Sequence, residues 1–149
     1  MTTRWFEDYA EGQEAEFGPL LVDEAEVIEF GRRFDPQPFH ADPAAAAEGP
    51  YGGLIASGWH TCALMMRLLA EQYLSPASSM GSPGIDELRW ILPVRPGDRL
   101  TLRTTVREAR RSRTKPDRGL VRTDVELVNQ NGAVVLSLRA MNLIRRRPT

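Results

Sequence analysis

Three segments in the second half of the chain alternate apolar residues with polar or charged ones. Strict alternation is the pattern of a strand with one buried face, so each segment is predicted to be a half-buried β-strand. A shorter alternation over residues 88–92 and a possible strand over 14–21, broken at Gly18-Pro19, bring the expected number to about five. The long alternating segments are 100–106, 121–127 and 134–140.

The first half of the chain shows helical spacing instead. Residues from Ser57 to about Leu74 are apolar on almost every face, which predicts a buried helix. Asp23 is a suitable N-cap for a short helix that ends near Phe34. Asp42, followed by proline, is expected to begin a second short helix through the alanines that follow.

One buried helix with about five antiparallel strands predicts an α+β fold. From the pattern alone, we expect an antiparallel sheet packed on a helix. The length of 149 residues predicts a single domain over residues 1–149.

Composition excludes several classes of protein. A hydrophobic fraction of 42%, a charged fraction of 26% and a net charge of −1 are typical of a globular protein and argue against a general nucleic-acid binder. The sequence has no apolar run long enough to span a membrane and no signal-peptide pattern, so no membrane association and a cytoplasmic location are expected. Two histidines without cysteine partners are a poor zinc set, and we expect neither a metal nor a cofactor.

The most informative stretch runs from Phe34 to His60 and holds both histidines. Prolines follow Asp35 and precede His40, so an acid and an imidazole lie five residues apart on a stiff loop. Such a loop can hold the two groups at a fixed separation, as acid–base catalysis requires. Gly58 falls in the first turn of the long helix, where backbone N–H groups have no intrahelical partner and favour a developing negative charge.

The residues of this stretch resemble the MaoC-like family of acyl-thioester hydratases and dehydratases, which includes the (R)-specific enoyl-CoA hydratases. The similarity lies in D-x-Q-P-x-H-x-D from Asp35 to Asp42 and in Y-G-G-L-I-A-S-G from Tyr51 to Gly58. It extends to V-x-P-G-D at residues 94–98. Gln37 stands where asparagine is usual, and Ser57 where histidine often precedes the glycine.

The resemblance implies a hotdog fold, in which an antiparallel sheet wraps around a long central helix. It implies reversible addition of water to a 2-enoyl thioester of coenzyme A or of a carrier protein, as in fatty acid metabolism. Asp35 and His40 would be the catalytic pair, and Gly58, Ser57 and Gly53 would bind the substrate or the oxyanion. A homodimer, or a dimer or trimer of such dimers, is expected.

A basic cluster lies between two of the predicted strands. Its members Arg111, Arg113 and Lys115 suit the phosphates of coenzyme A, although a solvated hairpin loop explains them equally well. Two other functions stay open at this stage. They are a hotdog acyl-CoA thioesterase, in which an acid directs water onto the carbonyl carbon, and a non-catalytic subunit that binds acyl thioesters.

Overall fold

The computed structural model describes residues 2–149. Five strands form one antiparallel sheet in the order β1-β3-β4-β5-β2. The strands are β1 (Glu14–Leu21), β2 (Gly84–Trp90), β3 (Arg99–Arg111), β4 (Arg118–Val128) and β5 (Val134–Arg145). The predicted alternation is clear in β3 and β4, where every second residue is buried from Leu100 to Val106 and from Gly119 to Leu127.

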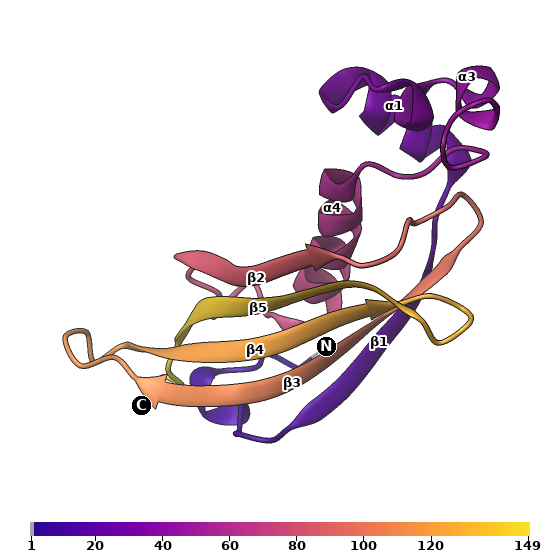
Figure 1. Cartoon of the computed structure of the whole chain (residues 1–149). Coiled ribbons are helices and arrows are strands. Elements are labelled where there is room, and N and C mark those ends of the chain that lie inside the picture. Colours follow the sequence, from indigo (N-terminus) through magenta and orange to yellow (C-terminus); the bar gives the residue numbers. More distant parts are fainter. Residues whose placement is uncertain (1) are drawn as a thin grey trace.

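The helices fall into two groups. The central one, α4 (Gly58–Leu68), lies against one face of the sheet and continues as a π-helical turn, η2 (Leu69–Tyr73) (Figure 1). The others form a segment that projects beyond the sheet at the N-terminal end of α4 (Figure 1). These are α1 (Glu24–Phe34), α2 (Pro38–Ala41) and α3 (Pro43–Ala47), while a short 3-10 turn, η1 (Phe6–Asp8), precedes β1.

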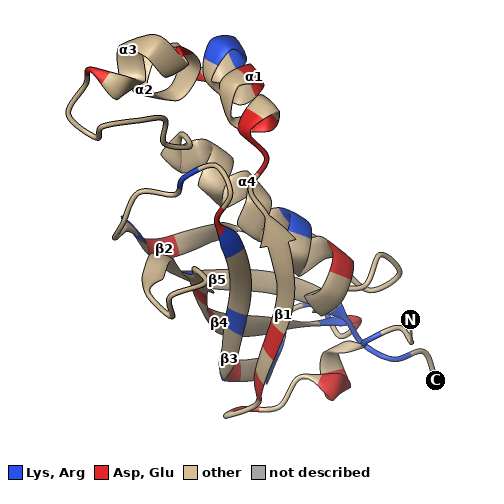
Figure 2. Cartoon of the chain, turned by 90° about the vertical axis from the view of Figure 1, so that its right-hand side faces the viewer, with Lys and Arg blue, Asp and Glu red and all other residues tan. Residues whose placement is uncertain are grey.

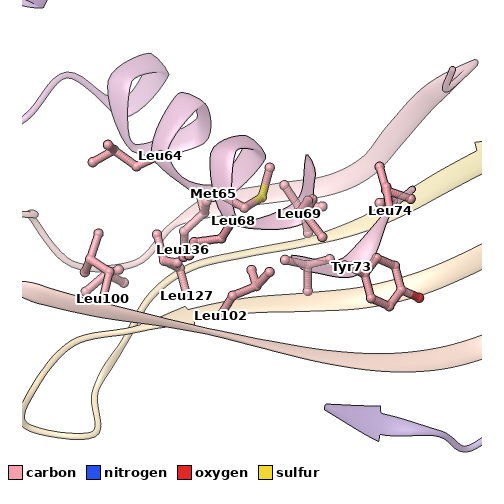
Figure 3. Packing of buried hydrophobic residues seen from close by; sticks show 14 of the residues in the cluster. Leu64, Met65, Leu68, Leu69, Tyr73, Leu74, Leu100, Leu102, Leu127 and Leu136 are labelled. Carbon is pink, nitrogen blue, oxygen red and sulfur yellow. The ribbon is translucent and has the colours of Figure 1, made fainter. Parts of the chain in front are cut away.

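The core fills the space between α4 and the sheet. Leucines of β3, β4 and β5 meet Leu64, Met65 and Leu68 of α4 (Figure 3). At the end of η2, the Tyr73 hydroxyl hydrogen-bonds to Thr123 of β4 at 2.7 Å, which fixes the C-terminal end of the central helix to the sheet. A helix held against an antiparallel sheet in this way is the hotdog fold, and the predicted α+β class is confirmed.

Three details differ from the sequence prediction. The α-helix ends at Leu68 rather than near Leu74, because the last turn widens to π-helical geometry. The strand predicted over 88–92 ends at Trp90, and the apolar side chains Trp90, Ile91 and Leu92 are all exposed in the single chain. Trp59 and Met66 of α4 are also exposed, so the helix is not buried on all faces.

The charged residues are unevenly placed. Figure 2 shows acidic and basic positions along the strands, whereas the first turns of α4 carry none. None of the helices within residues 2–149 is both long enough and apolar enough to cross a membrane. Because the first turns of α4 carry no Asp, Glu, Lys or Arg, charged side chains near its start come from the projecting segment and the connecting loops.

Candidate active site

Asp35 is held at the junction between α1 and α2. It is the C-cap of α1, where its N–H donates to the Gly31 carbonyl at 2.9 Å. Pro36 follows and Pro38 occupies the first position of α2, so the chain leaves α1 in extended geometry and turns at once into the next helix. This short connection places His40, on the one turn of α2, beside the acid that precedes it.

The structure brings the predicted catalytic pair together. His40 Nε2 lies 3.3 Å from Asp35 Oδ2, and the two side chains are only 7% and 19% exposed. The imidazole orientation is set from the other side, because Nδ1 lies 2.8 Å from the Ile55 carbonyl oxygen. A carbonyl oxygen can only accept, so Nδ1 carries a proton, and Nε2 is the ring nitrogen that faces Asp35.

Asp35 accepts hydrogen bonds on both carboxylate oxygens. Gln37 Nε2 donates to Oδ1 at 2.7 Å, and Ser57 Oγ donates to Oδ2 at 2.7 Å. Burial acts to raise the pKa of the Asp35 carboxyl, but these two hydrogen bonds and the charge of His40 outweigh it and lower the pKa. The group is therefore ionised at neutral pH and is a weak base in this arrangement.

A cavity of about 450 Å³ opens beside the pair. Its walls come from the projecting segment, from the start of α4 and from the connection between β2 and β3. The size is in the range of ordinary small-molecule sites, and the lining combines the two titratable groups with apolar side chains. The lining residues are Asp35, Gln37, Phe39, His40, Tyr51, Ile55, Ala56, Gly58, Trp59, Thr61, Trp90, Ile91, Leu92, Pro93 and Val94.

The start of α4 lies at this cavity. Ser57 is the N-cap, with its hydroxyl accepting from Trp59 N–H at 3.3 Å, and Gly58 is the first helical residue. Trp90 covers Gly58: the indole Nε1 donates to the Gly58 carbonyl at 2.8 Å. A Cβ on residue 58 would lie 2.6 Å from the indole ring, so a larger residue here would require the Trp90 side chain to move.

Other residues expected at the site lie apart from it. Gly53 is in the loop before α4 and does not line the cavity; a Cβ there would face Arg95 at 3.6 Å. Arg111, Arg113 and Lys115 are exposed around the turn between β3 and β4, at the opposite end of the sheet from the cavity (Figure 1). Within one chain the fold does not bring them to the catalytic pair.

Comparison with known proteins bears on what this geometry does. A family model described as the MaoC like domain matches residues 8–129. The matched part is well over half of the chain and contains the whole stretch from Asp35 to Gly58. The chain belongs to the MaoC-like family.

Solved structures of MaoC-like proteins agree with this assignment. A MaoC-like dehydratase from Rhodospirillum rubrum superposes with a TM-score of 0.89 at 39% identity, over 98% of this chain and 99% of that one. The (R)-hydratase PhaJ1 from Pseudomonas aeruginosa gives a TM-score of 0.78 at 26% identity, over 96% of this chain and 86% of its own. The family resemblance found in the sequence is confirmed.

A relative found by sequence comparison is also named as a dehydratase. The 3-hydroxyacyl-thioester dehydratase Z of Mycobacterium tuberculosis is 37% identical over 67 residues, which is 44% of this chain and 44% of that protein. Together these comparisons place the chain among hydratases and dehydratases of the MaoC-like family.

Four contacts of this MaoC-like site were not anticipated from the sequence. They are the Gln37 amide on Asp35, the Ser57 hydroxyl on Asp35, the Ile55 carbonyl on His40 and the Trp90 indole on Gly58. The first joins neighbours in one loop, and its D-x-Q spacing is visible in the sequence. The other three join residues 22, 15 and 32 positions apart, so only the folded backbone reveals them.

The second histidine is structural. His60, in the first turn of α4, is buried and stacks on Phe30 of α1 with ring centroids 4.9 Å apart. Its Nδ1 is buried without a hydrogen-bond partner among the described residues. His60 therefore packs the projecting segment against α4, and it does not line the cavity that holds Asp35 and His40.

Proposed function

We propose that the chain hydrates 2-enoyl thioesters of coenzyme A or of a carrier protein to 3-hydroxyacyl thioesters, and catalyses the reverse dehydration. The observation that carries this proposal is the Asp35–His40 pair, 3.3 Å apart, at the wall of a cavity that also contains the N-terminus of α4. Membership of the MaoC-like family supports the same reaction class.

The attacking water would be held by the pair. When the His40 ring is neutral, Asp35 Oδ2 and His40 Nε2 are both acceptors, so one water can donate a hydrogen bond to each. As the water oxygen adds to Cβ, one water proton passes to the Asp35–His40 pair, and the pair returns a proton to Cα. Acid–base assistance of this kind contributes about 10²–10⁴ in rate.

The thioester oxygen would lie at the start of α4. Addition of water at Cβ places negative charge on this oxygen as an enolate forms. The N–H of Gly58, at the first position of α4, has no acceptor within the helix and lies at the positive end of the helix dipole. Where single donors of this type have been removed from other enzymes, the loss was about 2.7–4 kcal/mol of transition-state stabilisation.

The reaction as proposed needs no cofactor. Every proton transfer is assigned to Asp35, His40 or water, and coenzyme A enters as part of the substrate. Among residues 2–149 no group of three or more His, Cys, Asp or Glu side chains is placed to hold a metal ion.

A homodimer is part of the proposal. The sheet has two edge strands, β1 and β2, and an edge strand presents backbone donors and acceptors that proteins usually pair or cover. We propose that β2 is the edge that pairs. Apolar side chains gather on and after this edge in the exposed residues Ile85, Trp90, Ile91 and Leu92. A second copy would cover them and would close the cavity, whose wall includes Trp90 to Leu92.

Incubation with crotonyl-CoA tests the reaction directly. Loss of absorbance of the conjugated double bond, without release of free thiol, is the expected result. Release of thiol would instead indicate a thioesterase, and no turnover across a panel of enoyl-CoA chain lengths would indicate a binding subunit. The same panel defines the length and substitution of the acyl group, and parallel assays with carrier-protein thioesters identify the carrier.

A further inference from the structure

Gln37 makes a contact that its position in the fold does not require. It is the N-cap of α2, but its side chain makes no hydrogen bond to the N–H groups of that helix. The amide is turned toward Asp35, where Nε2 donates to Oδ1 at 2.7 Å. Its backbone N–H donates to the Asp35 carbonyl at 2.7 Å, so both parts of Gln37 bind the same residue.

The length of the Gln37 side chain explains why its amide binds Asp35 and does not cap α2. Asparagine at an N-cap places its oxygen on the free N–H groups of the first turn, and it is among the preferred capping residues. Glutamine has one more methylene and is not a favoured cap, so its amide is free to reach the neighbouring carboxylate. The Gln37 side chain is exposed and lines the cavity, which leaves it room to turn away from Asp35.

The contact with Gln37 affects the basicity of the Asp35 carboxylate, because it occupies a lone pair of Oδ1. Oδ2 already meets Ser57 Oγ at 2.7 Å and His40 Nε2 at 3.3 Å. Oδ1 accepts from the Gln37 amide, so each carboxylate oxygen accepts one hydrogen bond, from Ser57 and from Gln37. Hydrogen bonds to the charged form make a carboxylate a weaker base, and efficient base catalysis near neutral pH needs a stronger one.

We propose that Gln37 is a positioning residue that clamps Asp35 before substrate binds and releases Oδ1 when the acyl thioester enters the cavity. The clamp holds the carboxylate in the rotamer that faces His40. Release removes one donor and makes Asp35 more basic at the moment when water must be deprotonated. This inference rests on the proposed hydratase function for its kinetic meaning, but the contact itself can be tested without activity.

His40 is the titratable group in direct contact with Asp35 in the part of the chain that the structure describes. The other charged or titratable side chains on neighbouring elements bind elsewhere: to carbonyl oxygens, to aromatic rings or to a helix N-terminus. They are Arg32, Arg33, Asp42, Tyr51 and Arg95. A change in the titration of Asp35 after substitution of Gln37 therefore reports the amide contact.

The test compares Gln37→Leu, Gln37→Asn and Gln37→Glu with the wild-type chain, using Gln72→Leu as a control outside the cavity. The Asp35 carboxyl is titrated by carbon-detected NMR, with its resonance assigned by its absence in Asp35→Asn. We expect the midpoint to rise by about 0.5–1 pH unit in Gln37→Leu and Gln37→Asn, and further in Gln37→Glu. Gln72→Leu should leave it unchanged.

The kinetic readout is the acidic limb of kcat/KM for crotonyl-CoA, which reports the free enzyme. It should move to higher pH by the same amount as the NMR midpoint. An unchanged NMR midpoint in all three Gln37 variants would overturn the clamp, whether or not the chain is a hydratase. A raised midpoint in a protein without hydratase activity would retain the clamp and reject the proposed function. Lower kcat with an unmoved acidic limb would reduce Gln37 to a packing role and overturn the proposal.

Discussion

Gly31 of α1 passes so close to His40 that a Cβ on residue 31 would lie 2.3 Å from the His40 carbonyl oxygen. No real side chain tolerates such an approach, so α2 can lie against α1 only because this position is glycine. The position of the His40 imidazole thus depends on a residue that lacks a side chain. The contact also explains how one turn of α2 keeps a fixed position on the projecting segment.

Gly31→Ala should therefore displace α2 and weaken catalysis. Overpacking costs about 1–3 kcal/mol, and the better helix propensity of alanine offsets up to about 1 kcal/mol of it. We expect kcat for crotonyl-CoA to fall at least tenfold with a modest loss of thermal stability. Gly84→Ala is a matched control, because a Cβ there meets only the end of Met141 at 3.9 Å. Equal activity of the two variants would show that α2 does not depend on Gly31.

The catalytic pair should behave as a unit. Asp35→Asn and His40→Ala should each lower kcat by about 10²–10⁴, because either change removes one acceptor of the shared water. The double variant should be little slower than the slower single variant. Circular dichroism and gel filtration check that fold and assembly persist. Losses that add fully in log kcat would mean that the two residues act on different protons.

The elements of the fold were predictable where one physical pattern dominates. Period-two alternation located β3, β4 and β5, and Asp23 and Asp42 were recognised as the caps of α1 and α3. The proximity of Asp35 and His40 was predictable because the two residues share one short loop. Trp90 was expected in an ordinary half-buried strand, and its position over Gly58 was missed. That contact joins two elements whose relative placement depends on the packing of the whole sheet, which sequence periodicity does not encode.

The contact between Trp90 and Gly58 yields a prediction. Helix propensity alone favours alanine at position 58, but a Cβ there would lie 2.6 Å from the indole. We expect Gly58→Ala to lose about 1–3 kcal/mol of unfolding free energy in the wild-type background. In a Trp90→Leu background the same change should have little effect, since the ring is gone. Urea titration of the four chains measures the difference, and an equal loss in both backgrounds would exclude the indole as its cause.

His60 should make stability depend on pH. Burial lowers the pKa of its imidazole, and the Glu26 carboxylate opposes the shift. The unfolded chain therefore binds a proton more readily than the folded one, and the stabilising contribution is present above the unfolded pKa, near 6.5. It is lost as pH falls below that value, until the folded group also becomes protonated.

His60→Phe isolates this contribution, because phenylalanine keeps the stack on Phe30 and cannot titrate. Unfolding free energies measured between pH 7.5 and pH 5 should fall more steeply for the wild-type chain than for the variant. His40 and the carboxylates are present in both chains and cancel in the comparison. Parallel pH profiles would show that the His60 imidazole has the same proton affinity in both states.

The last prediction concerns Arg111 and Arg113. β3 has 13 residues and is about 40 Å long, and these arginines lie at or beyond its end, away from the cavity. Pairing of two β2 edges about a two-fold axis normal to the sheet would turn the partner end to end. It would bring the partner's β3–β4 turn to the end of the sheet where this chain's cavity lies. The proposed contact with coenzyme A phosphates would then come from the second subunit.

Mixed dimers distinguish this arrangement from a contact within one chain. Arg111→Ala with Arg113→Ala should raise KM for crotonyl-CoA and leave the crotonyl-pantetheine thioester unaffected, because only the former carries the phosphates. Asp35→Asn should be nearly inactive with both substrates. When the two variants are unfolded and refolded together, one cavity in each mixed dimer combines an intact Asp35 with intact arginines from its neighbour. Activity at low crotonyl-CoA concentration should then exceed the sum of the separate variants. Activity equal to that sum would show that the arginines of one chain do not contact phosphates in the partner's cavity. Arginines that act only within their own chain cannot raise the activity, because neither chain of a mixed dimer has both an intact Asp35 and intact arginines.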